Sequence, residues 1–412
     1  MEADKSKKKR KKKRKWMKFR HKIVRNLAMV FLEPITAALY RIKIEKFKEE
    51  GTRPYLILYN HQTAFDQFFV GLAFKQPVYY VASEDLFSNG FISDLLRWLV
   101  APIPIKKQTT DVAAVMNCMR LAREGGTLAI APEGNRTYSG KTEYIAPSIA
   151  TLAKKIQLPI AIYRIEGGYG VQPRWSDKTR KGTMRSYVSK VIEPDEYATM
   201  SNDELFSLIK KELYVDEGTA DAEFISGKRA EYLERAIYVC PYCGLSEFKS
   251  SGNETECQKC HRKITYGKNK TLQGVGFQFP YSFVTEWYEA QKQFVCALDL
   301  QPYTNVPMYI DKAKLSEVIV YKRKLVLRKN AEFKLYGNRI TIDEGKENSI
   351  VLPFDEISVI SVLGRNKLNI YYDKQIFQFQ GNKRFNALKY VNIYYHYKNI
   401  SKGEKYGEFL GL

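Results

Sequence analysis

Histidine and cysteine are scarce in this chain of 412 residues, which contains four histidines and six cysteines. So few cysteines exclude a dense disulfide scaffold of the kind that small secreted domains use. The sequence also lacks an uninterrupted apolar run of about 18 residues, and we therefore expect no ordinary membrane-spanning helix. No short apolar segment with a small-residue cleavage site follows the basic start of the chain, which argues against a secretory signal peptide.

Acidic residues are outnumbered, with 45 aspartates and glutamates against 67 lysines and arginines and a formal net charge of +22. Half of that excess lies in residues 1–22, which hold thirteen basic and two acidic side chains. We expect this segment to be a disordered tail because its like charges repel one another. Such a tail can be merely solvated, or it can bind nucleic acid or anionic lipid, and its composition does not choose among these.

Residues 23–40 follow the tail with fourteen apolar residues among eighteen. The four polar positions fall on one arc of a helix, so the segment has a wide apolar face and a basic entry. A helix of this kind at 23–43, beside a polybasic tail, is typical of a segment that lies in a membrane interface. The alternative is a helix that packs on its own domain. Pro34 should kink or divide the helix.

The rest of the composition is that of a globular protein, with 44% apolar and 27% charged residues, and the length suits two or three domains. Between residues 54 and 200, short apolar runs alternate with helical periodicity. The expected strands are 55–59, 78–82, 127–131 and 159–165, and the expected helices are 111–123 and 146–155. This alternation predicts an α/β domain with a largely parallel sheet, followed by a charged helical stretch at 201–236.

The sequence Asn-His-Gln-Thr-Ala-Phe-Asp occupies residues 60–66, directly after the first expected strand. His61 and Asp66 can meet across a strand-to-helix turn, where the carboxylate would fix the tautomer of the imidazole and raise its basicity. A histidine held in this way is a general base for a hydroxyl group. The pattern by itself is weak evidence for a catalytic base, because a structural histidine beside an aspartate that caps a helix is the commoner explanation.

A second polar segment, Pro-Glu-Gly-Asn-Arg at residues 132–136, follows another expected strand. Glu133, Gly134 and Arg136 stand at the mouth of the expected sheet, where backbone N–H groups and a guanidinium can hold a phosphate. The alternative is a surface turn that contains a Glu–Arg ion pair.

Together, the two segments resemble blocks of the glycerolipid acyltransferases, specifically the 1-acylglycerol-3-phosphate acyltransferase family. The first block of that family, NHxxxxD, is matched in full by residues 60–66, and the third, FPEGTRS, is matched at four positions of residues 131–137. The second block, GxIPVxR, reads APIPIKK at residues 101–107, where Lys107 replaces the arginine. Residues 158–163 resemble the fourth block, and the resemblance covers about half of the chain.

The resemblance implies a reaction and a role for each matched residue. His61 would deprotonate a glycerol hydroxyl that attacks an acyl thioester, and Asp66 would orient His61 and stabilise the imidazolium. The residues implied to hold the acceptor phosphate, or to add charge there or near the developing oxyanion, are Glu133, Gly134, Arg136, Lys106 and Lys107. The acyl donor would be acyl-CoA or acyl carrier protein, and the chemistry would need neither a redox cofactor nor a metal.

Four of the six cysteines form two CxxC pairs with the spacing C-x2-C-x13-C-x2-C, which is typical of a zinc ribbon. We predict one structural zinc ion in a unit at 237–270, since four thiolates leave no open position for catalysis. The predicted ligands are Cys240, Cys243, Cys257 and Cys260, with His261 as a less favoured substitute. A zinc ribbon can bind nucleic acid, but beside an enzyme motif we favour a rigid spacer or a protein contact.

From about residue 310 the apolar residues alternate with period two, and turn signals separate the runs. We expect strands at 333–342, 350–354, 357–362, 367–372 and 375–380, with a closing helix at 384–398. This order resembles a pleckstrin-homology-like or GRAM-like domain, and a generic β-sandwich or small barrel is the alternative. The expected organisation is an acyltransferase domain at 44–236, a linker of unclear structure at 271–310, the β domain at 311–400 and a tail at 401–412.

The leading hypothesis is an enzyme that acylates lysophosphatidic acid to phosphatidic acid in phospholipid synthesis. It would act at the cytoplasmic face of a membrane, as a peripheral or monotopic protein on an anionic surface, and nucleic acid is not an expected partner. Another lysophospholipid or glycerol 3-phosphate stays open as the acceptor, because the second and third blocks depart from the family pattern. The hypothesis from another class is a catalytically inactive protein that binds membranes or nucleic acid.

Overall fold

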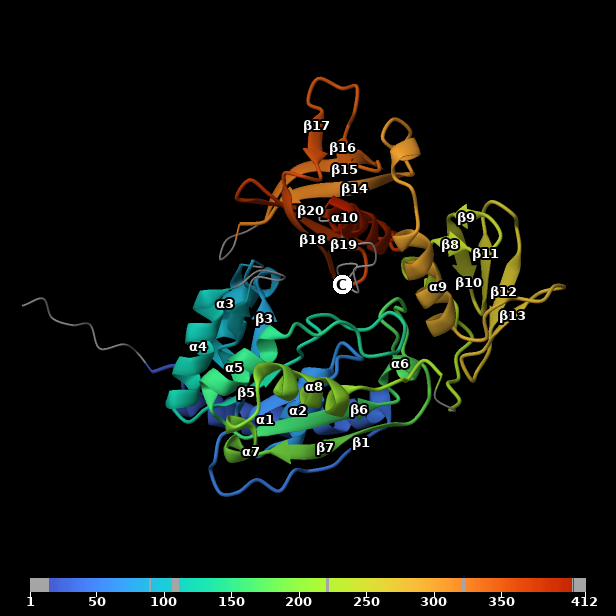
Figure 1. The fold of residues 1–412 in the computed structure, drawn as a ribbon. Helices are drawn as coiled ribbons and strands as arrows, with labels where there is room; N and C mark the ends of the chain where they lie inside the picture. Colours follow the sequence, from blue (N-terminus) through green and yellow to red (C-terminus); the bar gives the residue numbers. More distant parts are fainter. Residues whose placement is uncertain are drawn as a thin grey trace, which may run out of the picture.

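The computed structural model describes residues 15–88, 90–105, 111–219, 222–319, 324–401 and 403. Within these ranges the chain forms an N-terminal α/β domain, a small β unit that carries the paired cysteines, and a C-terminal antiparallel β domain (Figure 1). Residues 1–14, which make up most of the predicted basic tail, and nearly all of the predicted C-terminal tail lie outside the described residues.

The first helix, α1, spans Phe19–Tyr40, so it begins four residues earlier than predicted. Pro34 lies inside it and does not divide it, because a proline removes only one intrahelical hydrogen bond and the flanking turns keep theirs. Only three of its side chains are buried. By length and composition, α1 is the one helix in the described residues that could cross a membrane. This differs from the expectation of no such helix, because a long helix tolerates a few polar positions that interrupt an apolar run.

A seven-stranded sheet forms the centre of the α/β domain, in the order β1-β7-β6-β2-β5-β3-β4. Every pairing is parallel except that of β6 with β7, so the predicted largely parallel sheet is confirmed. The four predicted strands correspond to β2, β3, β5 and β6. The strands are β1 Ile42–Ile44, β2 Leu56–Tyr59, β3 Val78–Ser83, β4 Ile103–Ile105, β5 Thr127–Ile130, β6 Ile160–Glu166 and β7 Met184–Ile192.

Helices flank this sheet, and two of them begin within one residue of the predicted starts at 111 and 201 (Figure 1). Asp111 accepts a hydrogen bond from the backbone N–H of Ala114 at 3.0 Å and starts α4. Ser201 and Glu204 form a capping box that starts α8. The helices are α2 Asp66–Ala73, α3 Phe91–Val100, α4 Val112–Arg123, α5 Ser148–Ile156, α6 Gly168–Val171, α7 Pro194–Ala198 and α8 Asn202–Leu213.

The predicted helical stretch at 201–236 is wrong beyond Leu213, where α8 ends. The described part of the remainder is mostly irregular because tertiary contacts take the place of helical periodicity. The buried Phe224 ring occupies space that Gly170 and Gly182 leave open, since a Cβ at either glycine would lie within 2.3 Å of that ring. Packing of this kind overrides the helix preference of charged residues.

The segment 271–310, whose structure the sequence leaves unclear, is mostly structured. Strand β13 (Leu272–Gly274) is the fourth strand of the small sheet β10-β11-β12-β13, and α9 (Val284–Cys296) is a regular helix. Trp287 of α9 is buried and donates from Nε1 to the carbonyl of Val239 at 2.8 Å. The other elements of this part are η2 Leu233–Arg235, β8 Val239–Cys240, β9 Gly244–Leu245, β10 Phe248–Ser251, β11 Glu254–Cys257, β12 Lys263–Tyr266 and η3 Gln301–Tyr303.

The C-terminal domain is one antiparallel sheet of seven strands in the order β17-β16-β15-β14-β20-β19-β18, closed by helix α10. This arrangement agrees with the predicted strands and closing helix. The predicted strand at 333–342 is instead two strands, because residues 336–338 form the turn between β15 and β16. The elements are β14 Tyr309–Glu317, β15 Leu325–Leu335, β16 Arg339–Ile342, β17 Ile350–Pro353, β18 Ile357–Leu363, β19 Lys367–Tyr372, β20 Gln375–Gly381 and α10 Leu388–Ser401.

The three parts share a packed interior. One cluster of buried apolar residues includes Tyr138 and Trp175 of the α/β domain, Trp287 of the cysteine-bearing unit and Phe333 of the C-terminal domain. Figure 1 shows β18 and β19 on the side of the C-terminal domain that faces the α/β domain. The turn between these two strands, residues 364–366, therefore lies at the boundary of the two domains.

Candidate active site

The site forms where β2 and β5 end, at the carboxyl edge of the parallel strands. Asn60 follows β2, and its side-chain amide makes hydrogen bonds of 2.8 Å with both the carbonyl and the N–H of Ile165. These two bonds clamp the end of β2 to β6. They fix the direction in which the next residue, His61, leaves the strand.

His61 and Asp66 lie together, with Nδ1 of the imidazole 2.8 Å from Oδ2 of the carboxylate. Asp66 is fully buried, and it also accepts from the backbone N–H groups of Gln62 and Thr63 and from the Thr63 hydroxyl, at 2.6–2.9 Å. These donors hold the carboxylate in one orientation, where it accepts the Nδ1 proton and leaves Nε2 as the basic nitrogen. Phe65 occupies the N-cap position of α2, so Asp66 is not a helix-capping aspartate.

Glu133 connects the two motif segments. It is buried, and its carboxylate accepts from the backbone N–H of His61 and from that of Glu143, both at 2.8 Å. Burial raises the pKa of Glu133 to about 8, and the two backbone donors only partly offset this effect. In the described residues Glu133 forms no ion pair with Arg136, so the surface-turn alternative does not fit this geometry.

Gly134 and Arg136 have different surroundings. Gly134 has a φ of +69°, which favours glycine, and its N–H donates to the carbonyl of Ala131 at 3.0 Å. That N–H is thus used in the turn and does not point at a ligand. Nη1 of Arg136 is buried and has no hydrogen-bond partner among the described residues. Burial, then the nearby Arg174 and Arg365, lower the pKa of Arg136 to about 10.

Two residues of the predicted site cannot be placed. Lys106 and Lys107 lie outside the described residues, although strand β4 (Ile103–Ile105) ends directly before them. Strand β4 pairs with β3 at one edge of the sheet.

A cavity of about 1220 Å³ opens beside His61. At one end it is polar, and its lining includes His61, Glu133, Gly134, Arg136, Arg174 and Gly364. It continues between α1 and α3, where the lining includes Val24, Ala28, Leu32, Leu96, Leu99 and Val100. The arrangement can hold an amphiphilic molecule with its charged end near His61 and its apolar part between the two helices.

Arg174 is a site residue that sequence reasoning missed. It is 2% exposed, stacks over the Tyr138 ring at 4.2 Å and donates from Nη1 to the carbonyl of Arg136 at 2.9 Å. No motif marks it, and it comes 38 residues after Arg136 in the chain. Only the fold brings the two guanidinium groups to one cavity.

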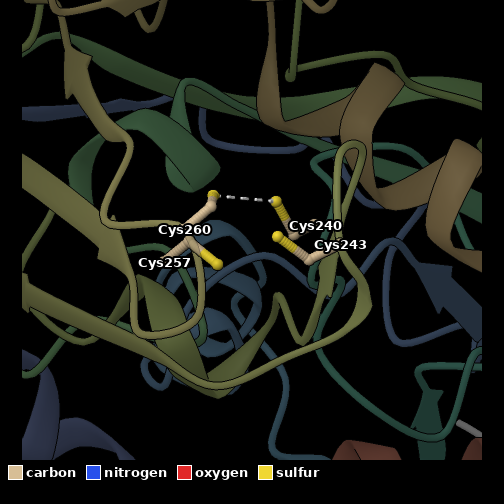
Figure 2. Close-up of side chains that lie close together, drawn as sticks. All are labelled: Cys240, Cys243, Cys257 and Cys260. Atoms are coloured by element: carbon tan, nitrogen blue, oxygen red, sulfur yellow. Dashed lines mark hydrogen bonds between the residues drawn. The ribbon is translucent and has the colours of Figure 1, made fainter.

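The four predicted metal ligands form a second cluster, outside this cavity (Figure 2). The sulfur atoms all lie within 4.8 Å of one another, and those of Cys240 and Cys260 are 3.9 Å apart. Four thiolates at such separations fit one tetrahedral ion with Zn–S bonds of about 2.3 Å. His261 is exposed and contacts Glu256 at 3.1 Å, so it stands apart from the sulfur cluster.

Comparisons with known proteins agree with the sequence motifs of the first domain. Residues 40–165 match a protein-family model described as Acyltransferase, so this part of the chain is an acyltransferase-like domain. A chloroplastic 1-acyl-sn-glycerol-3-phosphate acyltransferase of Brassica napus, BAT2, is 22% identical over 183 residues, which are 42% of this chain and 51% of that protein. The chloroplastic LPAT1 of Arabidopsis thaliana, of the same description, is 21% identical over 194 residues, or 45% of this chain and 52% of that protein.

The chain thus spans about half the length of the curated relatives it matches. Among solved structures, the crystal structure of the 1-acyl-sn-glycerophosphate acyltransferase PlsC from Thermotoga maritima is similar. It has a TM-score of 0.38 and 20% sequence identity, and the match covers 46% of this chain and 77% of that one.

Proposed function

We propose that this protein transfers a fatty acyl group from a thioester to the free hydroxyl of lysophosphatidic acid and so forms phosphatidic acid. The observation that carries the proposal is the His61–Asp66 pair at the polar end of a cavity whose other end is apolar. His61 takes the proton of the acceptor hydroxyl as that oxygen attacks the thioester carbonyl. The thiolate leaves, and the imidazolium, stabilised by Asp66, returns the proton to it and so forms the free thiol.

The polar end of the cavity supports a phosphate monoester as the acceptor headgroup. Arg136 supplies a guanidinium with a spare donor there. Glu133 has a positioning role in this proposal instead of the phosphate contact that the resemblance implied, since both of its oxygens accept from backbone N–H groups. The acyl donor is acyl-CoA or acyl carrier protein, since both carry the same thioester arm.

The experiment that tests this function offers the purified protein acyl-CoA, or acyl carrier protein, with a panel of acceptors. The panel contains lysophosphatidic acid, lysophosphatidylcholine, lysophosphatidylglycerol and glycerol 3-phosphate, and mass spectrometry identifies the products. We expect phosphatidic acid to form fastest. Faster acylation of another acceptor would redirect the proposal to that acceptor, and no product from a folded protein would favour the hypothesis of an inactive binding protein.

The raised pKa of Glu133 predicts a pH dependence of acceptor binding. Below about pH 8 the side chain is protonated and neutral, whereas above it the carboxylate repels the nearby acceptor phosphate. The KM for lysophosphatidic acid should therefore rise about fivefold between about pH 7 and pH 9. Initial rates in wild type and Glu133→Gln check this, because the variant has no charge to gain. An equal rise in both proteins would assign the effect to another group.

We also propose that Cys240, Cys243, Cys257 and Cys260 hold one structural zinc ion. The support is the tetrahedral spacing of the four sulfur atoms and the closed thiolate set. The ion would stabilise the knuckles before β9 and after β11 and so hold the small sheet on the rest of the chain.

Metal analysis of protein purified without chelators should find about one zinc ion per chain. Cys257→Ser should lose most of that metal and unfold at a lower temperature, because metal binding and local folding are coupled. Cys296→Ser is the matched control, since Cys296 is a partly buried cysteine outside the cluster and should leave the metal content unchanged. Metal-free wild type, or equal zinc in Cys257→Ser, would contradict the assignment.

Two exposed apolar surfaces support attachment to a membrane. On α1 the exposed side chains include Ile23, Leu27, Val30, Phe31 and Ile35, and on α3 they include Phe91, Ile92, Leu95 and Trp98. The two helices are in contact, and Arg20 donates to the carbonyl of Trp98 at 2.8 Å. We propose that α1 and α3 together rest on the cytoplasmic face of an anionic membrane, with the cavity between them opening to the lipid.

The C-terminal domain keeps its proposed assignment as a pleckstrin-homology-like or GRAM-like domain. The support is the single antiparallel sheet of seven strands with one closing helix, α10. We propose that the acyltransferase-like domain is followed by a cysteine-bearing unit that extends through α9, and that the β domain begins at β14; the bounds of these elements support this division.

A further inference from the structure

The polar end of the cavity holds more positive charge than the described residues balance. Neither Arg136 nor Arg174 has a carboxylate within ion-pair distance among the residues that the structure describes, although Arg174 is 2% exposed. Arg174 directs its donors at carbonyl and amide oxygens, and Nη1 of Arg136 has no partner there. Buried guanidinium groups without an anion are unfavourable, so this end of the cavity is built for a negatively charged ligand.

The C-terminal domain reaches the same end of the cavity. Gly364, at the turn between β18 and β19, lines the cavity. The carbonyl of Val362 lies 3.5 Å from Nη2 of Arg174. Arg365 follows Gly364 and makes an ion pair of 3.0 Å with Asp177 of the α/β domain. The C-terminal domain thus forms one wall of the site that contains His61.

Asp177 does not neutralise Arg365. Its carboxylate is already held by the buried Arg235, with contacts of 2.7 and 3.2 Å, so two guanidinium groups share one negative charge. Arg365 and Arg174 are also close enough to lower the pKa of Arg136, after the larger effect of burial. The turn therefore adds a positive charge beside a pair of arginines that lack an anion.

We propose that the turn at residues 364–366 of the C-terminal domain completes the acceptor-headgroup site, and that Arg365 is a specificity-determining residue that acts with Arg136 and Arg174 on the phosphate of the acceptor. The proposal rests on the proposed function and specifies the headgroup of the acceptor as a phosphate monoester. The two negative charges of a phosphate monoester match the excess positive charge of the arginines. Acceptors whose phosphate is a diester carry one charge less and a larger headgroup, and the wall at Gly364 disfavours them.

The competing explanation is that Arg365 only ties the two domains together through Asp177. Arg384 offers a matched control, because it belongs to the same domain and forms similar contacts, with Glu234 and with the carbonyl of Ser250. Neither Arg384 nor a residue next to it lines the cavity, whereas Gly364, next to Arg365, does. A purely structural loss should appear equally in Arg365→Gln and Arg384→Gln. Such a structural loss should lower the melting temperature and reduce kcat, without a specific effect on the KM of one substrate.

Steady-state kinetics with lysophosphatidic acid and acyl-CoA test the proposal. Arg365→Gln should raise the KM for lysophosphatidic acid about tenfold or more, because a charge-assisted contact to phosphate is lost. Its kcat and its KM for acyl-CoA should stay within about threefold of wild type, and Arg365→Lys should recover part of the loss. Arg384→Gln should keep the wild-type KM for both substrates.

A second readout separates this inference from the proposed function. We expect sn-glycerol 3-phosphate to raise the melting temperature of wild type and of Arg384→Gln but not of Arg365→Gln. If wild type forms no phosphatidic acid and yet shows this Arg365-dependent shift, the proposed function is wrong and the headgroup site stands. If wild type is active and Arg365→Gln has the same KM and the same shift as wild type, the inference is wrong and the proposed function stands.

Discussion

Replacing His61 with alanine should lower kcat/KM for acyl transfer by about 100- to 10,000-fold, because the reaction loses the base that deprotonates the acceptor hydroxyl. The imidazole lies at the polar end of the cavity and is oriented by the buried carboxylate of Asp66, 2.8 Å away. Asp66→Asn should lose a large part of the same activity, since an amide can stabilise the wrong tautomer and cannot stabilise the imidazolium. Initial rates at saturating acyl-CoA measure both effects.

The matched control is the other histidine of the cavity. His21 lies on α1, contacts the Tyr79 hydroxyl at 3.0 Å and has its pKa lowered to about 4 by burial, with smaller effects of Arg20 and Lys18. His21→Gln should keep kcat within about tenfold of wild type, because within the described residues no carboxylate pairs with His21 as Asp66 pairs with His61. Near-normal turnover in a well-folded His61→Ala protein would contradict the mechanism. An equal loss of activity in His21→Gln would also contradict it.

Adding two negative charges to the apolar face of α1 should release the protein from membranes even at high salt. Leu27 and Phe31 are 59% and 66% exposed, so Leu27→Glu with Phe31→Glu places both charges at the lipid without disturbing the core. Burial of apolar area contributes roughly 25 cal/mol per Å² and does not depend on salt, whereas attraction of the basic tail does. Deleting residues 1–14 should therefore weaken binding mainly at low salt.

Flotation with vesicles of phosphatidylcholine and phosphatidylglycerol measures this difference. Ile310→Glu with Val351→Glu is the matched control, because these side chains belong to strands β14 and β17 of the C-terminal domain and are 52% and 49% exposed. That control should float like wild type at both salt concentrations. Wild type that stays in the soluble fraction at low salt would refute the membrane proposal, and a misfolded Leu27→Glu, Phe31→Glu protein would show that α1 packs internally.

The elements that the sequence predicts well are those whose signals are local. The apolar runs that became β2, β5 and β6 pair in the parallel centre of the sheet, and the helices capped by Asp111 and Ser201 start where they are expected. The two CxxC pairs, which lie within one short stretch of the chain, also come together as their spacing predicts. The sequence prediction and the structure agree at these positions because residues that are close in the chain decide the local geometry.

The features that the sequence does not reveal depend on contacts between distant residues. The stretch that looks like a linker folds because Trp287 finds a buried place against Val239. Arg174 and Arg365 carry no motif. Arg174 meets Arg136 through the fold of the α/β domain, and Arg365 comes near Arg136 only because the C-terminal domain packs on that domain. Glu133 also differs from the expectation that it helps to hold the acceptor phosphate, because its carboxylate accepts from backbone N–H groups of other segments.

The central claim is tested most directly by following a labelled acyl chain. Wild-type protein bound to vesicles that contain lysophosphatidic acid is given an acyl thioester with a carbon-13-labelled chain, and mass spectrometry follows the lipids. The account predicts phosphatidic acid with one labelled chain per molecule, in step with release of the free thiol, and almost none from His61→Ala. No labelled phosphatidic acid from a folded, vesicle-bound wild type, with either acyl-CoA or acyl carrier protein as donor, would contradict it.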